Sequence, residues 1–346
     1  MPADLVFITG GTGFIGCHVI KEVLEAGHRA RLSVRRESAI QDMKDLFPKH
    51  VDQLEFIVIS DITKSDSFHS ALNGVRYILH LASPIPGANS DFKRDYEEPA
   101  VRGTVAILEA AQQAPSVKRV VITSSANVFM PLDWVAQQLP EVTPGTSHDI
   151  DLNLESMAPP MHPMIMYHAS KVLAHRACLD WANAYASLHF DIVTTHPALS
   201  IGKHLLQVPA SSGSSNGVLW MSLFTQKVSF PILGVDVRDV ALAHLRVLDA
   251  ALQAGVNEFL LGSPEWSWEV VLDFIKREYP GLGVRVKGPL PDPIKPRSER
   301  TEELLKIQWT AVEDSVRELV DQQIELGQDL VLPSVEESAT EQIYTY

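Results

Sequence analysis

The stretch Leu5-Val6-Phe7-Ile8-Thr9-Gly10-Gly11-Thr12-Gly13-Phe14-Ile15-Gly16 decides the fold of this chain. A short apolar run, typical of a buried strand, leads into glycines at every third position, and a helix-like segment follows. Gly10 permits a tight turn, Gly13 lets the backbone approach a pyrophosphate, and Gly16 lets helix and strand pack closely. The pyrophosphate would lie at the helix N-terminus, where unpaired N–H groups point outward. The stretch therefore predicts a dinucleotide site at the first strand-to-helix turn.

Bulk composition narrows the class of protein. The chain has 346 residues, 45% of them hydrophobic, which is enough for one large core or two closely joined ones. Its net charge of −14, partly from the acidic tail at 336–341, argues against nonspecific binding to nucleic acid or to an anionic membrane. No apolar run reaches membrane-spanning length and the first strand begins close to the N-terminus, so we expect a cytoplasmic protein. Cys17 and Cys178 lack metal-like spacing, so we expect buried thiols and no metal site.

Apolar strand-like runs alternate with amphipathic helix-like runs, which is typical of a parallel sheet covered on both faces. Strands are expected at 5–9, 30–34, 54–59, 77–81, 119–123 and 190–195. Helices are expected at 14–26, 39–47, 65–72, 91–113 and 167–187. The pattern predicts an α/β fold with a doubly wound, parallel-sheet Rossmann domain over residues 1–200.

Two further regions complete the expected organisation. A proline-punctuated loop at 130–165 interrupts the alternation, and a loop of this length in a compact domain is usually functional. Residues 201–346 are expected to form a smaller α/β region, with a strand at 257–261 and helices at 239–253, 267–278 and 311–326. This region would act as a substrate lid over the carboxyl edge of the sheet, where ligands bind in such folds.

The end of the second strand indicates which coenzyme is bound. An enzyme that uses NADH is expected to carry an Asp or Glu there, which holds the ribose hydroxyls. Here Arg35 and Arg36 occupy the turn, and the first carboxylate after the strand is Glu37. A guanidinium suits a phosphate oxyanion, and Lys44 can add a second positive charge. The sequence therefore favours NADPH over NADH.

Two more strand ends carry candidate coenzyme contacts. Asp61 and Ile62 follow the third strand, where a carboxylate could accept from the adenine amine and an apolar side chain could lie against the ring. An Asp in this position is also a common helix cap. Leu81-Ala82-Ser83-Pro84 ends the fourth strand, and its small residues would let the backbone pass beside the pyrophosphate and ribose.

The candidate catalytic residues are Tyr167, Lys171 and a hydroxyl of the run Thr123-Ser124-Ser125. Tyr167 and Lys171 are spaced by one helical turn and share a face, so the lysine should lower the tyrosine pKa towards neutrality. Lys171 could also bond the nicotinamide ribose. The run Thr123-Ser124-Ser125 ends the fifth strand on the same edge as the glycine loop, and a hydroxyl there can polarise a substrate carbonyl together with the tyrosine.

These motifs resemble the extended short-chain dehydrogenase/reductase superfamily, and within it the dihydroflavonol reductase, cinnamoyl-CoA reductase and yeast ketone/aldehyde reductase group. The resemblance spans residues 3 to about 280 and includes the glycine run, Leu81–Pro84, Thr123–Ala126, Tyr167 with Lys171, and Val235–Ala241. It implies an NADPH-dependent carbonyl reductase in which Ser125, Tyr167 and Lys171 are catalytic. The implied coenzyme contacts are Gly10, Thr12, Gly13, Phe14, Ile15, Gly16, Arg35, Lys44, Asp61, Ile62, Leu81, Ala82, Ser83, Thr123, Tyr167, Lys171, Pro197, Ala198 and Leu199.

The chain departs from the group's pattern near the expected substrate. His196 stands before Pro197 where the plant enzymes usually carry Asn or a similar polar residue, and apolar bulk follows Ser125. These departures favour a moderately large, largely apolar ketone or aldehyde, such as a secondary metabolite, over a flavonoid or a cinnamoyl thioester. The candidate substrate contacts are Ser83, Pro84, Ser125, Met130 and His196.

Three alternatives stay open. A nucleotide-sugar epimerase or dehydratase would use the same scaffold with NAD, and a 3β-hydroxysteroid dehydrogenase would share the catalytic residues. A nonenzymatic NADPH-sensing module is a different class, but such proteins typically lose the tyrosine or the lysine. The expected partner is a small carbonyl substrate, and the expected oligomeric state is a monomer or a homodimer.

Overall fold

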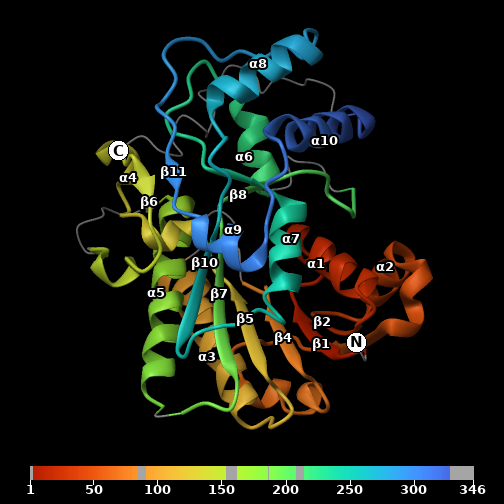
Figure 1. Ribbon diagram of the computed structural model, residues 1–346. Helices are drawn as coiled ribbons and strands as arrows, with labels where there is room; N and C mark the ends of the chain where they lie inside the picture. Colours follow the sequence, from red (N-terminus) through yellow and green to blue (C-terminus); the bar gives the residue numbers. More distant parts are fainter. Residues whose placement is uncertain (1–2, 84–90, 153–161, 186, 208–213, 328–346) are drawn as a thin grey trace.

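The computed structural model describes residues 3–83, 91–152, 162–185, 187–207 and 214–327, and within them seven parallel strands form one sheet (Figure 1). The strand order is β10-β7-β5-β4-β1-β2-β3. The strands are β1 (Leu5–Thr9), β2 (Arg29–Val34), β3 (Leu54–Val58), β4 (Tyr77–His80), β5 (Arg119–Thr123), β7 (Asp191–Pro197) and β10 (Val256–Leu261). The order runs outward in both directions from the β1–β4 pair, so the predicted doubly wound sheet is confirmed.

Helices cover both faces of this sheet because the strands are apolar on both sides. All of β1 is buried, and its side chains alternate between two cores. Val6 packs in one core with α1 (Phe14–Glu25) and α7 (Val237–Arg246). Phe7 packs in the other with α3 (Glu98–Gln112) and α5 (Pro163–Asn183).

The remaining helices are short or lie outside these two layers. They are α2 (Ser38–Leu46), α4 (Trp134–Gln137), α6 (Ser215–Ser222), α8 (Trp268–Glu278), α9 (Glu299–Leu305) and α10 (Val312–Glu325). A π-helical turn, Phe92–Glu97, leads into α3, and 3-10 turns occupy Pro48–Gln53, Ser65–Phe68, Ser70–Leu72, Ala126–Phe129 and Ser147–Asp149. None of the helices in the described ranges combines the length and apolarity needed to cross a membrane.

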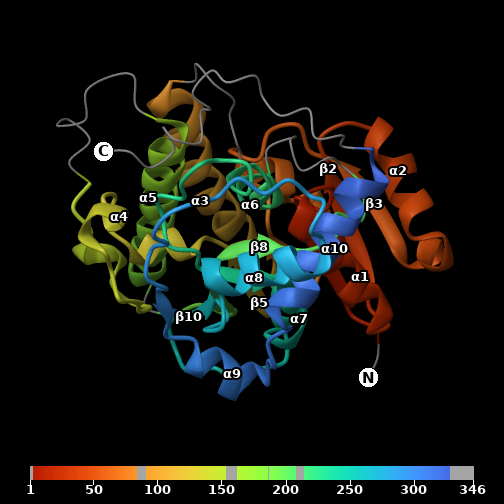
Figure 2. The ribbon, with the colours of Figure 1, turned by 90° about the horizontal axis from the view of Figure 1, so that it is seen from above.

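The C-terminal region lies over the carboxyl ends of the strands, and α8 and α10 are seen there from above (Figure 2). It has its own core, which includes Trp220, Trp266, Trp268 and Leu319. Two small parallel sheets connect distant segments: β8 (Leu199–Ile201) pairs with β9 (Gly234–Asp236), and β6 (Glu141–Val142) pairs with β11 (Lys295–Pro296).

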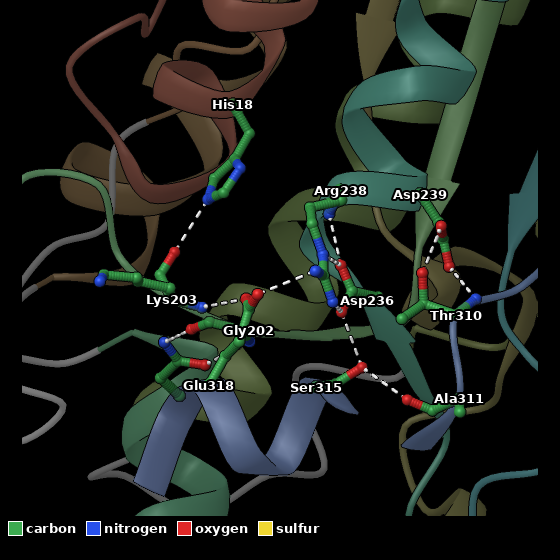
Figure 3. A network of polar contacts seen from close by, with 11 residues as sticks. His18, Gly202, Lys203, Asp236, Arg238, Asp239, Thr310, Ala311, Ser315 and Glu318 are labelled. Carbon is green, nitrogen blue, oxygen red and sulfur yellow. Dashed lines mark hydrogen bonds and ion pairs between the residues drawn. The ribbon is translucent and has the colours of Figure 1, made fainter. Parts of the chain in front are cut away.

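A polar network holds α10 against the start of α7 (Figure 3). Arg238 donates to Asp236 at 2.7 Å and to Glu318 at 2.8 Å, and the Ser315 hydroxyl donates to Asp236 at 2.7 Å. Glu318 also accepts from the backbone N–H of Lys203 at 3.3 Å. Because Asp236 is fully buried and accepts from a guanidinium and a hydroxyl, the network fixes the C-terminal region on the Rossmann layer.

The structure differs from the expected organisation at the 257–261 strand and at the 130–165 loop. The strand expected at 257–261 joins the main sheet beside β7 instead of remaining in the lid. The described part of the 130–165 loop contains α4, which packs on the C-terminal core, and β6, which pairs with β11. It also contains a 3-10 turn, which Arg176 of α5 holds by donating to the Ser147 carbonyl at 2.7 Å. The division of the chain at residue 200 therefore stays a proposal, since the sheet draws on both sides of it.

Two helix boundaries have local causes. The helix expected from residue 167 begins at Pro163, because His162 caps the first turn by accepting from the Met164 N–H at 3.2 Å and proline suits the first helical position. The helix expected to reach residue 253 ends at Arg246. There the buried Arg119 guanidinium donates to the carbonyls of Leu248 and Ala250, at 2.9 and 3.0 Å, and so holds the chain in a turn.

Candidate active site

The glycine loop between β1 and α1 has the backbone geometry of a dinucleotide cradle. Gly10 has φ of 71°, a conformation that glycine adopts without strain. A Cβ at Gly16 would lie 2.1 Å from the Gly10 carbonyl oxygen, so helix and strand approach closely only because side chains are missing. Gly13 precedes the helix, and no side chain in the described ranges caps the first turn. The first N–H groups of α1 are thus available to a phosphate.

Two exposed arginines, Arg35 and Arg36, follow β2 as expected, and neither has an ion-pair partner in the described part of the chain. Lys44 lies in the last turn of α2, with its Nζ 5.9 Å from the centre of the Phe56 ring. Cations without a carboxylate partner remain free to bind an oxyanion, so Arg35 and Lys44 fit a 2′-phosphate.

Asp61 is not the helix cap that the sequence allowed, because the next 3-10 turn begins at Ser65 with Lys64 at its N-cap and Asp61 instead holds a local turn. Its Oδ1 accepts from the Thr63 N–H at 2.9 Å and from the Thr63 hydroxyl at 2.6 Å, and Oδ2 lies 3.3 Å from Lys64 Nζ. The Thr63 bonds, followed by Lys64, hold the pKa of this carboxyl below its usual value. Ile62 packs towards Gly103, where a Cβ would be 3.3 Å from it. An adenine contact at Asp61 and Ile62 stays a prediction.

The end of β4 is tied to the glycine loop by Thr9, which sequence reasoning missed. The Thr9 hydroxyl accepts from the Ala82 N–H at 3.1 Å and lies 2.9 Å from His80 Nδ1. Leu81 and Ser83 are half-buried beside it, and Pro84 lies outside the described residues. The position of Thr9 directly before the first glycine was the available signal.

Tyr167 and Lys171 share a face of α5, as their spacing predicts, with Lys171 Nζ 5.8 Å from the centre of the Tyr167 ring. The Ser125 hydroxyl lies close enough to the phenol to favour its ionised form, so the three candidate catalytic residues meet at the carboxyl end of β5. Lys171 also donates to the Thr123 carbonyl at 3.4 Å. The Thr123 hydroxyl points to the other side and bonds His244 of α7 at 2.8 Å. Of the polar groups of Thr123, the backbone carbonyl is therefore the one that contacts Lys171.

The expected lowering of the Tyr167 pKa by Lys171 is wrong for this structure. Burial raises the pKa of Tyr167, and the opposing contribution comes from the Ser125 hydroxyl. Burial also lowers the pKa of Lys171 to about 8. A raised pKa keeps the phenol protonated at neutral pH and makes it a weaker acid than an exposed tyrosine.

Met130 and His196, two of the candidate substrate contacts, are part of the core. His196 is fully buried: Nδ1 lies 3.3 Å from the Ser125 carbonyl oxygen and Nε2 lies 2.8 Å from the Thr194 hydroxyl. Burial, reinforced by the neighbouring His175, lowers its pKa well below the usual value. Met130 is 3% exposed and packs in the C-terminal core. Neither side chain has a surface that a substrate could reach, because the turn after Ser125 is folded inward against them.

His168 holds the same turn from α5. Its Nε2 lies 2.6 Å from the Asn127 carbonyl oxygen and 3.0 Å from that of Met130. Burial lowers the pKa of His168 to about 4, so the ring is a neutral donor at pH 7. His168 and His196 together fix the backbone that carries Ser125.

The end of β7 also lies at the carboxyl edge of the main sheet. Pro197 is buried, and Ala198 and Leu199 are half-buried where the main sheet meets β8. Ala198 donates to the Leu261 carbonyl and Leu199 to the Leu233 carbonyl, both at 2.9 Å. The residues predicted at the ends of β1, β2, β4, β5 and β7 therefore share one edge of the sheet. Away from this edge, Cys17 and Cys178 are buried free thiols, as expected.

Comparison with known proteins agrees with this arrangement. Residues 6–262 match the NAD dependent epimerase/dehydratase family. Ketoreductase sphI of Aspergillus fumigatus is 36% identical over 338 residues, covering 94% of this chain and 99% of its own, and ketoreductase azaE of Aspergillus niger is 31% identical over 298 residues, covering 82% and 85%. The crystal structure of Gre2 from Candida albicans in complex with NADPH has a TM-score of 0.80 at 24% identity, covering 93% of this chain and 99% of Gre2. Vestitone reductase from alfalfa has a TM-score of 0.73 at 22% identity, covering 93% and 99%.

The two structural matches show the shared fold, and the sequence matches extend over nearly the whole described chain. The motifs that suggested the resemblance lie inside the matched range, from the glycine loop to the end of β10. The chain belongs to the NAD dependent epimerase/dehydratase family, and thus to the extended short-chain dehydrogenase/reductases.

Proposed function

We propose that this protein is an NADPH-dependent reductase of ketones or aldehydes. The observation that carries the proposal is the meeting of Ser125, Tyr167 and Lys171 at the sheet edge that also holds the glycine loop. The names of the relatives support it, since two of those at 31% identity or more are called ketoreductases.

The residues fit NADPH on three counts. No described side chain caps the first turn of α1, the loop has room for a backbone–phosphate contact only because Gly10 and Gly16 lack side chains, and Arg35 is an exposed cation at the end of β2. NADPH is also the coenzyme bound in the Gre2 complex. When bound, NADPH supplies the hydride. The chain itself supplies the positive helix end for the pyrophosphate and guanidinium and ammonium groups for the 2′-phosphate.

The proposed mechanism assigns one task to each catalytic side chain. The Ser125 hydroxyl and the Tyr167 phenol both donate to the substrate carbonyl oxygen and polarise it. Tyr167 gives its proton to the alkoxide as hydride reaches the carbon, and its raised pKa keeps that proton in place beforehand. The Lys171 ammonium orients the nicotinamide ribose.

We infer that the substrate is a moderately large, largely apolar carbonyl compound. Half-buried apolar side chains of Leu199 and of α6, namely Val218 and Met221, pack on the C-terminal core beside the carboxyl edge of the sheet. The ketoreductase names of the relatives favour a ketone.

The test is NADPH oxidation with a panel of aromatic, aliphatic and polyketide-like ketones and aldehydes, followed by the Tyr167→Phe variant on any substrate found. We expect kcat to fall by a factor on the order of hundreds with NADPH affinity retained, because only the proton donor is lost. Tyr185→Phe is the matched control, since Tyr185 is 40% exposed beyond the end of α5. Equal turnover in Tyr167→Phe and the native protein would remove Tyr167 from the mechanism.

A further inference from the structure

Helix α5 carries a third polar side chain on the face of Tyr167 and Lys171. His175 follows Lys171 by four residues, so the three side chains lie in a row along the helix. The His175 side chain is fully buried, and its Nε2 lies 2.7 Å from the Glu258 carboxylate on β10. Glu258 keeps part of its side chain in contact with solvent.

The other ring nitrogen of His175 has no hydrogen-bond partner within the described ranges. Since Nε2 faces a carboxylate, Nε2 carries the hydrogen, and Nδ1 of the neutral ring is then an acceptor. Buried polar atoms are nearly always paired with protein or with ordered water. The unpaired Nδ1 therefore indicates that a donor belongs beside it.

A cavity of about 20 Å³ lies between α5 and the strands, and both His175 and Lys171 line it. Thr123, Ser124 and Thr194 line it as well, which adds hydroxyl and backbone groups. A buried water needs roughly 10–15 Å³ and two to four polar partners. The cavity has room for one water and offers it those partners.

The signs of the surrounding charges select water over a metal ion. The nearest metal-like cluster is His175, His196 and Glu258, whose ligand atoms lie within 4.8 Å of one another. Both nitrogens of His196 are already hydrogen-bonded, and the Lys171 ammonium on the same cavity would repel a cation. A water that accepts from Lys171 and donates to His175 satisfies both groups.

We propose that His175 is a positioning residue for Lys171, acting through one buried water. Lys171 Nζ donates to the water, the water donates to His175 Nδ1, and His175 Nε2 donates to Glu258. Every donor points the same way, from the ammonium on α5 to the carboxylate on β10, so the chain favours the charged form of Lys171. This inference rests on the proposed reductase function, because it assigns a support to the lysine of that site.

The titratable groups around Lys171 and His175 come from four elements: Tyr167 on α5, His80 on β4, His196 on β7 and Glu258 on β10. Burial, together with the Lys171 charge, lowers the pKa of His80 to about 3, so His80 is neutral in the working range. Burial alone lowers the pKa of Lys171 to about 8. The chain should raise the pKa of Lys171 above the value set by burial, and its loss should lower that pKa again and bring the alkaline loss of activity to lower pH.

Two substitutions separate the water link from the Glu258 contact. Gln at position 175 reaches Glu258 but has no atom at the Nδ1 position, whereas Asn has an acceptor near Nδ1 and does not reach Glu258. We expect His175→Gln to move the alkaline limb of kcat/KM down on the order of one pH unit, and His175→Asn to restore most of that shift. Because the Asn variant loses the Glu258 contact, it should be the less stable of the two, although its pH profile should be closer to that of the native protein. If the pH profile follows stability instead, with Asn shifted more than Gln, His175 is only a structural residue.

Val172→Ala is the matched control, because Val172 is a buried residue of the same helix that does not line the cavity. It should lower Tm and leave the alkaline limb in place. A shift as large as that of His175→Gln would show that general loosening of α5 explains the effect.

A measurement without substrate separates this proposal from the proposed function. The ¹⁵N shifts of the His175 ring, at about pH 8 and thus above the usual titration range of histidine, should show the neutral tautomer protonated at Nε2. A hydrogen on Nδ1, or tightly held zinc in the purified protein, would overturn the water link. Absence of any reductase activity with the expected tautomer present would overturn the proposed function and leave the His175 geometry intact.

Discussion

Arg35 is the side chain on which we propose that the choice of coenzyme depends. It is exposed at the end of β2, where the sheet edge meets the glycine loop, and has no ion-pair partner in the described part of the chain. A carboxylate at this position would bond the ribose hydroxyls of NADH, whereas a guanidinium has only donors and suits a phosphate. The turn between Val34 and Glu37 holds no acidic residue, and this absence favours NADPH over NADH.

Arg35→Ala should weaken NADPH binding by about 10- to 100-fold and change NADH binding little, because one charge-assisted contact to the 2′-phosphate is lost. Fluorescence titration with both coenzymes measures the selectivity. Arg36→Ala removes the same charge one residue away and should keep the preference for NADPH. Equal weakening of both coenzymes by Arg35→Ala would place the phosphate elsewhere and would favour the NAD-linked epimerase alternative.

At the scale of elements, the β1–α1 unit depends on close approach of two backbones. The Gly16 position lies against Gly10 and Gly11, so the helix begins directly over the end of the strand. This approach aims the N-terminus of α1 at the sheet edge, where the candidate catalytic residues also lie. Any side chain at Gly16 must push the helix away from that edge.

Gly16→Ala should destabilise the protein by about 1–3 kcal/mol and weaken NADPH binding, because its Cβ would meet backbone atoms that cannot move independently. Thermal unfolding and coenzyme titration measure the two effects. Gly281→Ala is the control, since Gly281 is exposed with no atom within 4 Å of an added Cβ, and it should change neither quantity. An unchanged NADPH affinity in Gly16→Ala would mean that α1 does not hold the pyrophosphate.

For the whole molecule, buried neutral histidines link folding to pH. Burial lowers the pKa of His80 to about 3 and those of His168 and His244 to about 4. Their folded pKa values lie below the unfolded value near 6.5, so the unfolded state binds more protons in that range. Stability is therefore fully present above pH 6.5 and falls as the pH drops towards 4. Burial raises the pKa of Asp239 to about 6, so this carboxyl stabilises the folded state as the pH falls. Its effect offsets the destabilisation from about one of the three histidines.

Between pH 6.5 and 5 the free energy of unfolding should decrease by roughly 1.4 kcal/mol per pH unit for each of these histidines, less the Asp239 contribution. Urea unfolding at several pH values measures the slope. His244→Gln removes one titrating group and should make the slope shallower, while His69→Gln, at an exposed site, should leave it unchanged. A slope that is the same in all three proteins would show that His244 titrates normally in the folded state.

The sequence could predict much of this molecule because the decisive signals are local. The glycine loop, the Arg35 turn and the Tyr167–Lys171 face each depend on a few consecutive residues, and continuous apolar runs identify a buried parallel sheet. His175 lies one helical turn after Lys171, so the sequence places it on the same face. The sequence does not show that His175 pairs with Glu258, and a role for it could therefore not be predicted.

The features that the sequence could not predict depend on pairing between segments far apart in the chain. The main sheet adds β10 beside β7, and His175 meets Glu258 across 83 residues. The inward position of His196 and the Thr9–His80 contact likewise follow from which backbones pack together. The sequence by itself determined the fold class, the coenzyme cradle and the candidate catalytic residues, since short-range geometry suffices for these. The tertiary structure alone decided which polar groups are buried together, because burial and its effect on charge belong to the packed whole.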